Sequence, residues 1–245
     1  NLLIQTLALP VNVTATQLTP VWITMGDDTT YRGGLDCCEY DCDLIDLSDV
    51  VVSDNSHICV SHDAPILDRC DIIDMPGISD PNMDAQVWQR MIHHADAVIW
   101  CTHATQAWRQ SEAAVWSMLP DALYSKSFLL LTRMDKILSE RDQMRVVKRV
   151  GRETPGMFRE LFPISLTRAL AAGEDAEKWA DSGAKAFTSG LFDLISEVEA
   201  GKRGVREAEE AAANPAEPIL PTRVQIKGLR RRTRPAARPE PLPPM

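Results

Sequence analysis

Two acidic residues stand at the ends of apolar stretches, where they could act on a bound phosphate or a base. The first, Asp74, follows Ile72 and Ile73, and Gly77 comes three residues later. A carboxylate in this position can hold Mg²⁺, usually through water, and a glycine amide can approach a phosphate because no side chain intervenes. The ordinary alternative is a strand that ends in a turn, since Pro76 followed by Gly77 marks turns by itself.

The second acidic residue, Asp135, closes the segment 129–135 (LLLTRMD). A carboxylate can accept hydrogen bonds from the N1–H and 2-amino groups of guanine, and adenine does not offer this pair of donors. The segment resembles the guanine-recognition motif of GTPases, with Thr132 and Arg133 in the places of Asn or Thr and of Lys. The planar guanidinium of Arg133 could stack on a purine, although Arg and Lys are not interchangeable. Taken alone, Thr132 could equally be the N-cap of a helix.

A third segment, 162–165 (FPIS), ends in Ser165, thirty residues beyond Asp135. The segment is short and common, so its weight comes from its order with the other two. Asp74 comes first, Asp135 follows sixty-one residues later, and Ser165 comes last. Each ends a predicted strand, which is where open α/β sheets bind ligands.

Four apolar runs supply the strands that must position these residues. They are residues 66–73, 97–101, 128–131 and 162–164. Helical spacing between the later runs predicts an α/β fold with a mostly parallel sheet flanked by helices. Residues 56–61 alternate in polarity, so we also expect a hairpin with the strand ending at Ile73, and hence one antiparallel edge.

The two ends of the chain differ from its middle. Residues 1–9 are typical of a helix already in progress, and 172–213 contain at least one amphipathic helix. Eight of the sixteen prolines fall within 215–245. We therefore expect a folded domain over 1–200, a helical extension over 201–213, and a disordered Pro/Arg-rich tail over 214–245.

Composition excludes several classes of protein. The chain has no run of 18 apolar residues, so we expect no transmembrane helix. Its net charge of -9 argues against a nucleic-acid partner. Residues 222–245, with seven basic residues and one acid, are expected to be a solvated end or to attract anionic lipid headgroups. The six cysteines are expected to be reduced thiols in the cytoplasm.

With the three motifs in this order, the chain resembles the GTPase domain of dynamin-like proteins, particularly bacterial ones. The likeness covers about residues 1–200 and extends to the segments 9–27, 95–100 (ADAVIW) and 105–112 (TQAWRQSE). It implies a P-loop NTPase-like fold and hydrolysis of the phosphoanhydride bond of GTP with the help of Mg²⁺. It also implies a homodimer through this domain and work on membranes, in the cytoplasm or at the inner face of the membrane.

The resemblance assigns the binding of the base to the second and third motifs. Thr132, Arg133 and Asp135 would recognise the guanine of GTP or GDP. Ser165 would support them, because in this family the loop after the last strand contacts the base.

The resemblance assigns catalysis to three other positions. Asp74 would organise Mg²⁺, and Gly77 would touch the γ-phosphate. Thr16 is expected to be the switch threonine, which binds Mg²⁺ and orients the attacking water. Thr14 and Thr19 remain alternatives for that role, because the paired threonines often found in the family are absent here.

One motif of the family is missing from these residues: no G-x-x-x-x-G-K-[ST] occurs among them. That loop supplies the amides and the lysine that bind the β- and γ-phosphates. The helix that follows it in the family matches the segment beginning at Asn1, so we expect the loop and the first strand to precede residue 1. The alternative is true loss, which would make the chain a pseudo-GTPase or an interaction module that keeps the fold without hydrolysis.

Overall fold

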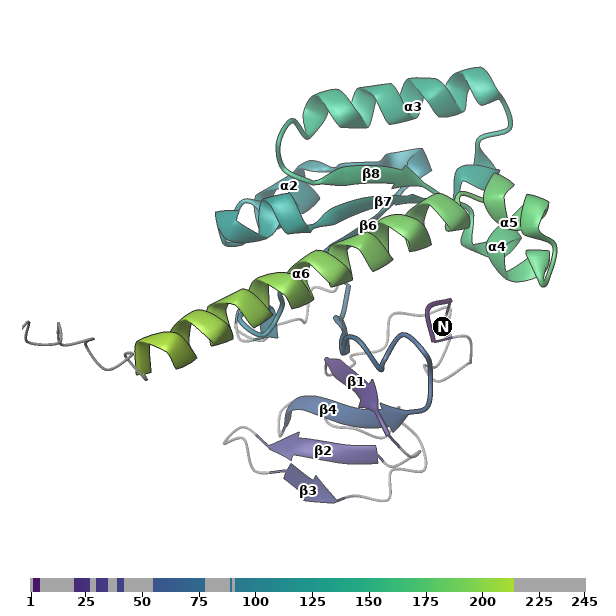
Figure 1. Ribbon diagram of the computed structural model, residues 1–245. Helices are drawn as coiled ribbons and strands as arrows, with labels where there is room; N and C mark the ends of the chain where they lie inside the picture. Colours follow the sequence, from purple (N-terminus) through teal and green to yellow (C-terminus); the bar gives the residue numbers. More distant parts are fainter. Residues whose placement is uncertain are drawn as a thin grey trace, which may run out of the picture. The chain divides into compact units, whose positions relative to one another are not determined.

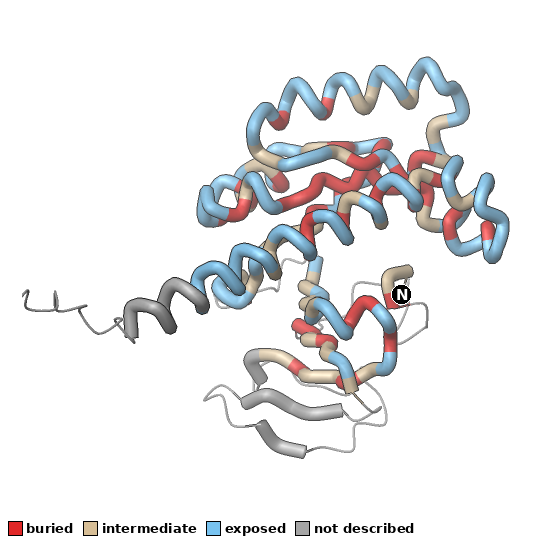
Figure 2. Tube along the Cα trace, in the orientation of Figure 1, coloured by how far each residue is buried: buried red, intermediate tan, exposed pale blue. Residues whose placement is uncertain are grey.

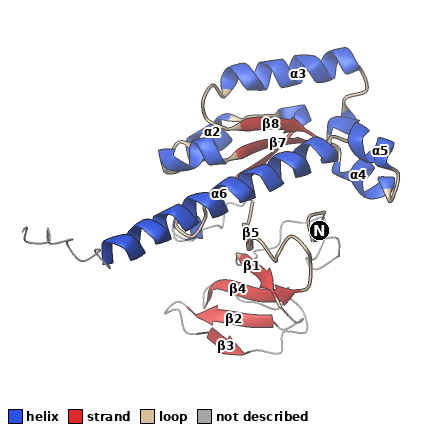
Figure 3. Ribbon diagram, in the orientation of Figure 1, coloured by secondary structure: helices blue, strands red, loops and turns tan. Residues whose placement is uncertain are grey.

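The structure, a computed structural model, has an α/β fold (Figures 1 and 3). It describes residues 2–4, 20–26, 30–34, 39–41, 55–77, 89 and 91–213. The chain divides into two compact units, Asn1–Lys202 and Arg203–Met245. In the described part of the chain, the strands form two sheets, and both lie in the first unit.

A three-stranded parallel sheet carries the second and third motifs. Its order is β6-β7-β8, with β6 at Ile99–His103, β7 at Phe128–Thr132 and β8 at Glu160–Pro163. Parallel neighbours need a crossover between them. The first crossover contains α2 (Gln110–Trp116) and the second contains α3 (Glu140–Glu153), as Figure 1 shows.

The central strand, β7, is buried along its whole length (Figure 2). Phe128 and Leu130 belong to a buried cluster with residues of α6 (Ala184–Ala213). The alternate residues, Leu129 and Leu131, belong to a second cluster with residues of α2 and α3. Helices therefore cover both faces of this sheet, which confirms the predicted α/β fold with a parallel sheet flanked by helices.

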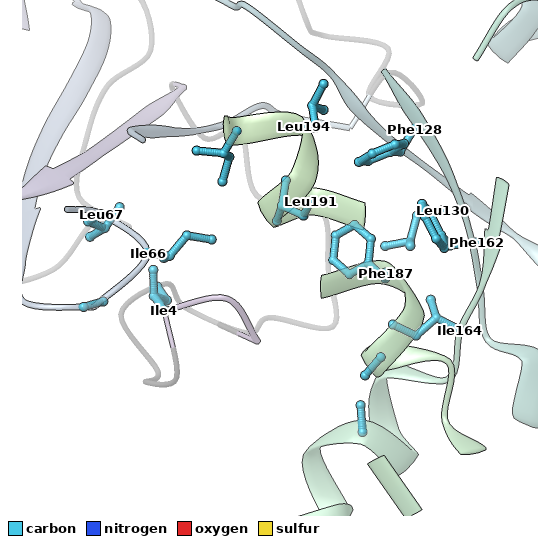
Figure 4. Packing of buried hydrophobic residues seen from close by; sticks show 14 of the residues in the cluster. Ile4, Ile66, Leu67, Phe128, Leu130, Phe162, Ile164, Phe187, Leu191 and Leu194 are labelled. Carbon is cyan, nitrogen blue, oxygen red and sulfur yellow. The ribbon is translucent and has the colours of Figure 1, made fainter. Parts of the chain in front are cut away.

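Aromatic rings join α6 to its face of the sheet (Figure 4). The ring of Phe162 lies edge-on to Phe128 with centroids 5.1 Å apart, and its centroid is 5.8 Å from that of Phe187 on α6. Such pairs add about 0.5–1.5 kcal/mol to the hydrophobic gain. The same cluster includes Ile66 and Leu67 from the turn before β5. The first half of α6 is thus part of the core.

A five-stranded mixed sheet carries Asp74. Its order is β3-β2-β4-β1-β5, with β1 at Val21–Met25, β2 at Thr30–Gly34, β3 at Glu39–Asp41, β4 at Asn55–His62 and β5 at Ile72–Asp74. β1 runs parallel to β4 and antiparallel to β5. β2 runs antiparallel to both β3 and β4.

The predicted hairpin is wrong, because β1 lies between β4 and β5 and pairs with both. The predicted strand over 66–73 is also shorter than expected. Its first part is a turn, in which Ile66 and Leu67 are buried in the core. The next two residues, Asp68 and Arg69, are exposed. Only β5 remains extended, so the long apolar run reflects burial more than strand pairing.

The C-terminal part of the first unit is helical. α4 spans Leu166–Ala172, α5 spans Ala176–Asp181, and α6 follows. Residues 200–206 of α6 are exposed. No helix in the described ranges is both long and apolar enough to cross a bilayer. Of the predicted helix over 1–9, only the turn at 2–4 is described, and the tail from 214 lies outside the described residues.

Candidate nucleotide-binding site

A side-chain hydrogen bond joins the second motif to the third. Ser165 Oγ donates to Asp135 Oδ1 at 2.8 Å, across thirty residues of sequence. The backbones meet as well, because the amide of Met134 donates to the carbonyl of Ile164 at 3.3 Å. Two of the predicted site residues are therefore brought together at the carboxyl ends of β7 and β8.

Ser165 is held in place by further hydrogen bonds. It is the N-cap of α4, and its Oγ accepts from the amide of Arg168 at 3.3 Å. Its own amide donates to the carbonyl of Ser182 at 2.9 Å, and its surface is only 2% exposed. Such a fixed hydroxyl gives Asp135 a well-defined hydrogen-bond donor.

Asp135 is poised to remain ionised. The hydrogen bond from Ser165 lowers the pKa of its carboxyl, and Lys136 Nζ lies 3.8 Å from Oδ2. An ionised carboxylate is an acceptor only, which is what a pair of base N–H donors requires.

Thr132 and Arg133 shape the turn that leads to Asp135. Thr132 is the last residue of β7, and its Oγ1 donates to the carbonyl of Thr102 at 3.0 Å, so it is not a helix cap. Arg133 has φ 59° and ψ 34°, a left-handed conformation that is uncommon outside glycine. This turn starts the short helix η5 (Met134–Lys136), and the Arg133 side chain remains exposed.

The carboxyl end of β6 adds basic groups to the same edge. His103 lies opposite Thr132 in the parallel register. Desolvation lowers the pKa of His103, and the charges of Arg133 and Arg109 lower it further. The histidine is therefore neutral near pH 7, and the two guanidinium groups provide the positive charge at this edge.

Asp74 is the last residue of β5, and no hydrogen bond or ion pair to its carboxylate occurs among the described residues. Its surface is exposed, yet the surrounding protein atoms desolvate it and raise the pKa of its carboxyl. Its charge acts on Cys101 of β6, whose pKa is raised to about 11, first by desolvation and then by Asp74. Asp74 is therefore close to β6.

The carboxylate of Asp74 is a group that Mg²⁺ prefers, and it could serve the ion directly or through water. Among the described residues, no cluster of three or more His, Cys, Asp or Glu side chains accompanies it. Gly77 also leaves room, since a Cβ at this position would meet no atom of the described residues within 4 Å. The predicted second ligand, Thr16, and its alternatives Thr14 and Thr19 lie outside the described residues.

Two residues next to the site, Thr102 and Glu112, received no role from the sequence. Glu112, in the first turn of α2, is 4% exposed and accepts hydrogen bonds from Thr102 Oγ1 and from the amide of Arg109. The one sequence signal for this arrangement is the three-residue spacing of Arg109 and Glu112 at a helix start, which is the spacing of a capping box.

No protein-family model matches the chain, and no curated protein is similar to it in sequence. Two solved structures of an oligomerised bacterial dynamin pair, described as sensing and tethering membranes over a long range, are similar in fold. The first has a TM-score of 0.65 at 17% identity and covers 86% of this chain and 44% of its own. The second has a TM-score of 0.61 at 15% identity, and the match covers 87% of this chain and 42% of the other.

These likenesses show an α/β fold. More particularly, the chain shares its fold with bacterial dynamins, which confirms the predicted resemblance. The chain spans less than half the length of the two bacterial dynamin structures that it resembles.

Proposed function

We propose that this chain is the guanine-nucleotide-binding part of a dynamin-like GTPase. It would bind GTP and GDP and, in the complete protein, hydrolyse the phosphoanhydride bond of GTP. The observation that carries the proposal is the hydrogen bond from Ser165 to Asp135, which holds an ionised carboxylate at the carboxyl edge of a parallel sheet. That edge is where open α/β sheets bind ligands.

Base recognition would follow from the arrangement around Asp135. The carboxylate has room for acceptor contacts beyond the one from Ser165, because its two oxygens offer about four lone-pair sites. The N1–H and 2-amino groups of guanine would occupy two of them. The exposed guanidinium of Arg133 would stack on the purine, and Thr132 would fix the start of the turn through its bond to Thr102.

Phosphate chemistry would depend on the first motif. Asp74 would hold Mg²⁺ together with Thr16, or with Thr14 or Thr19 in its place, and the Gly77 amide would face the γ-phosphate. When bound, Mg²⁺ neutralises the charge that develops on the phosphoryl oxygens. Within the part of the chain that the structure describes, no hydrogen bond or ion pair engages the Asp74 carboxylate and no atom crowds Gly77, which supports this assignment.

Membrane coupling is the remaining part of the proposal. The two similar structures are described as an oligomerised pair that senses and tethers membranes. For this chain, the seven basic residues within 222–245 support attraction to anionic lipid headgroups. We infer a bacterial protein that forms homodimers through this domain, in the cytoplasm or at the inner face of the membrane.

The decisive experiment introduces Asp135→Asn into the complete protein, which should change its base preference from guanine towards xanthine. An amide in place of the carboxylate donates to the 2-oxo group of xanthine and no longer accepts both guanine donors. We expect affinity for GTP to fall by about 10- to 100-fold and affinity for xanthosine triphosphate to rise. Equilibrium binding and phosphate release with each nucleotide measure both effects.

Asp142→Asn is the matched control, because Asp142 is an exposed aspartate paired with Arg145 on α3. It should leave both affinities unchanged. An unchanged preference for GTP in the Asp135 variant would contradict guanine recognition. A complete protein that binds GTP with the expected preference but releases no phosphate would instead be the pseudo-GTPase alternative.

A further inference from the structure

A buried carboxylate lies beside the candidate site and has no part in base or metal binding as proposed. Glu112 is 4% exposed, although it stands in the first turn of α2. Burying an ionised carboxylate is unfavourable unless hydrogen bonds and opposite charge compensate it. The partners of Glu112 therefore identify what the carboxylate holds in place.

Both oxygens of Glu112 have partners. Thr102 Oγ1 lies 3.1 Å from Oε1 and 3.0 Å from Oε2. The amide of Arg109 donates to Oε2 at 2.8 Å, and Nη2 of the same arginine lies 3.9 Å from Oε1. Glu112 thus connects the start of α2 to the end of β6.

The orientation of the Thr102 hydroxyl follows from these contacts. The amide of Trp108 donates to Oγ1 at 3.1 Å, so the hydroxyl proton is available for Glu112. Trp108 has φ 58°, which is rare for a bulky residue, and its ring lies edge-on to Trp100 and Phe158. By orienting Thr102, Glu112 stabilises this unusual turn.

Thr102 also contacts the guanine-recognition segment from its other side. Its carbonyl accepts the hydrogen bond from Thr132 Oγ1 at 3.0 Å. Thr132 directly precedes the left-handed Arg133 and, two residues further, Asp135. Thr102 therefore contacts Glu112 through its side chain and the recognition segment through its backbone.

We propose that Glu112 is a positioning residue for the guanine-recognition segment, residues 132–135. Through Thr102 it fixes the end of β6, and the end of β6 in turn fixes the start of the segment. The ligand in this inference rests on the proposed function, whereas the chain of contacts from Glu112 to Thr132 does not. Loss of the carboxylate should loosen the segment without removing any group that touches the nucleotide.

The test compares Glu112→Gln with Ser127→Ala in the complete protein. Gln keeps the size of Glu but leaves one oxygen to accept from both Thr102 and Arg109. Ser127 is fully buried, donates to the carbonyl of Leu123 at 2.7 Å and accepts from the amide of Val98 at 3.0 Å. Ser127 lies at the amino ends of β6 and β7. Ser127→Ala therefore alters a residue that is buried like Glu112, but at the other end of these strands.

We expect Glu112→Gln to raise the dissociation constant for GDP and KM for GTP by about tenfold, with kcat at saturating GTP within about twofold of the natural protein. Ser127→Ala should lower the melting temperature yet leave the dissociation constant for GDP unchanged. Thr102→Val should weaken GDP binding as Glu112→Gln does. Thr102→Ser should bind GDP as tightly as the natural protein, because it keeps the hydroxyl.

Amide hydrogen exchange in the nucleotide-free protein tests the same inference without a ligand. The amides of Met134, Lys136 and Ile137 are hydrogen-bonded in and around η5. They should exchange about tenfold faster in Glu112→Gln than in Ser127→Ala. Equal exchange in the two variants would overturn the positioning role. A natural protein that binds no GDP would contradict the proposed function, and the exchange rates would still decide the role of Glu112.

Discussion

Two carboxylates of the candidate site have opposite environments. Asp135 accepts a hydrogen bond from Ser165, which lowers the pKa of its carboxyl. Asp74 is desolvated, which raises the pKa of its carboxyl. Asp135 therefore stabilises the folded state at pH values above its unfolded pKa, and this contribution is lost as the pH falls through its folded pKa. For Asp74 the sign is reversed: its contribution is present below the unfolded pKa and is lost as the pH rises through the folded pKa.

This difference predicts opposite effects of two Asn substitutions on the nucleotide-free protein at pH 7. Asp74→Asn should raise the melting temperature, by less than about 2 °C because the residue is exposed, whereas Asp135→Asn should lower it. Both differences should shrink as the pH falls and the natural carboxyls become protonated. Because the lowered pKa of Asp135 places its titration below about pH 4, calorimetry from pH 7 to about pH 2 measures both differences.

With magnesium and GDP bound, the natural protein should have a higher melting temperature than Asp74→Asn, which reverses the order expected without them. The reason is that only the carboxylate holds the cation. Addition of Mg²⁺ and GDP should stabilise the natural protein more than the variant. A variant that gains as much stability as the natural protein would contradict the assignment of Asp74 as a magnesium ligand.

At the scale of elements, the position of Ser165 depends on how closely the turn before α6 approaches β8. Gly183, in that turn, has φ +85°, and a Cβ there would clash with the carbonyl oxygen of Pro163. The preceding residue, Ser182, accepts the amide hydrogen bond of Ser165. The site therefore requires a residue without a side chain at position 183.

Gly183→Ala should accordingly destabilise the fold by about 2 kcal/mol or more, because it combines left-handed strain with a clash against backbone that cannot move freely. The melting temperature should fall by roughly 4–8 °C, and binding of GDP should weaken as Ser165 shifts. Thermal unfolding and equilibrium binding measure the two effects.

Gly201→Ala is the matched control for Gly183→Ala. Gly201 lies in the exposed part of α6, and a Cβ there would meet no atom of the residues that the structure describes within 4 Å. Alanine should stabilise this position by about 0.5–1 kcal/mol. If both variants had the same stability, the close approach at position 183 would not matter to the fold.

At the scale of the molecule, the packed unit ends at Lys202. Ion pairs join the last part of α6 in this unit to three loops: Arg69 with Glu199 at 2.7 Å, Arg159 with Glu197 at 2.6 Å, and Asp96 with Lys202 at 2.6 Å. All six side chains are substantially exposed, so each pair contributes at most about 1 kcal/mol. The stability of the unit therefore comes from its buried clusters.

The proposed membrane contact belongs to this scale as well. Replacing the three arginines 230–232 by glutamine in the complete protein should weaken binding to vesicles with anionic phosphatidylserine by roughly 100-fold, at about 1 kcal/mol per residue. The melting temperature of the unit Asn1–Lys202 should not change. Vesicle cosedimentation and calorimetry measure the two quantities.

The control for the tail replaces Arg141, Arg145 and Arg152 of α3 by glutamine, which removes the same charge from an exposed helix. Vesicle binding should persist in this variant. An equal loss in both variants would mean that net charge, and not the tail, controls binding to the membrane.

The sequence predicts the three-stranded sheet well, because each strand is an apolar run that ends in a polar residue. It also predicts that Asp135 and Ser165 share an edge, since both follow such strands. It does not predict the place of β1 between β4 and β5, because the choice of partner depends on contacts distant in sequence. The role of Glu112 is hidden for the same reason, since its burial results from packing against Thr102.

The contact between Asp135 and Ser165 also has a consequence for the folding pathway. It joins residues thirty apart through the parallel pairing of β7 and β8, with α3 in between. Such non-local pairing forms slowly, because the loop must close before any contact is gained. A guanine nucleotide that needs both residues would bind the native state and not the unfolded chain. At a concentration one hundred times its dissociation constant, the nucleotide would add about 2.7 kcal/mol to the free energy of unfolding. It would therefore favour chains in which β7 and β8 are paired over partly folded chains.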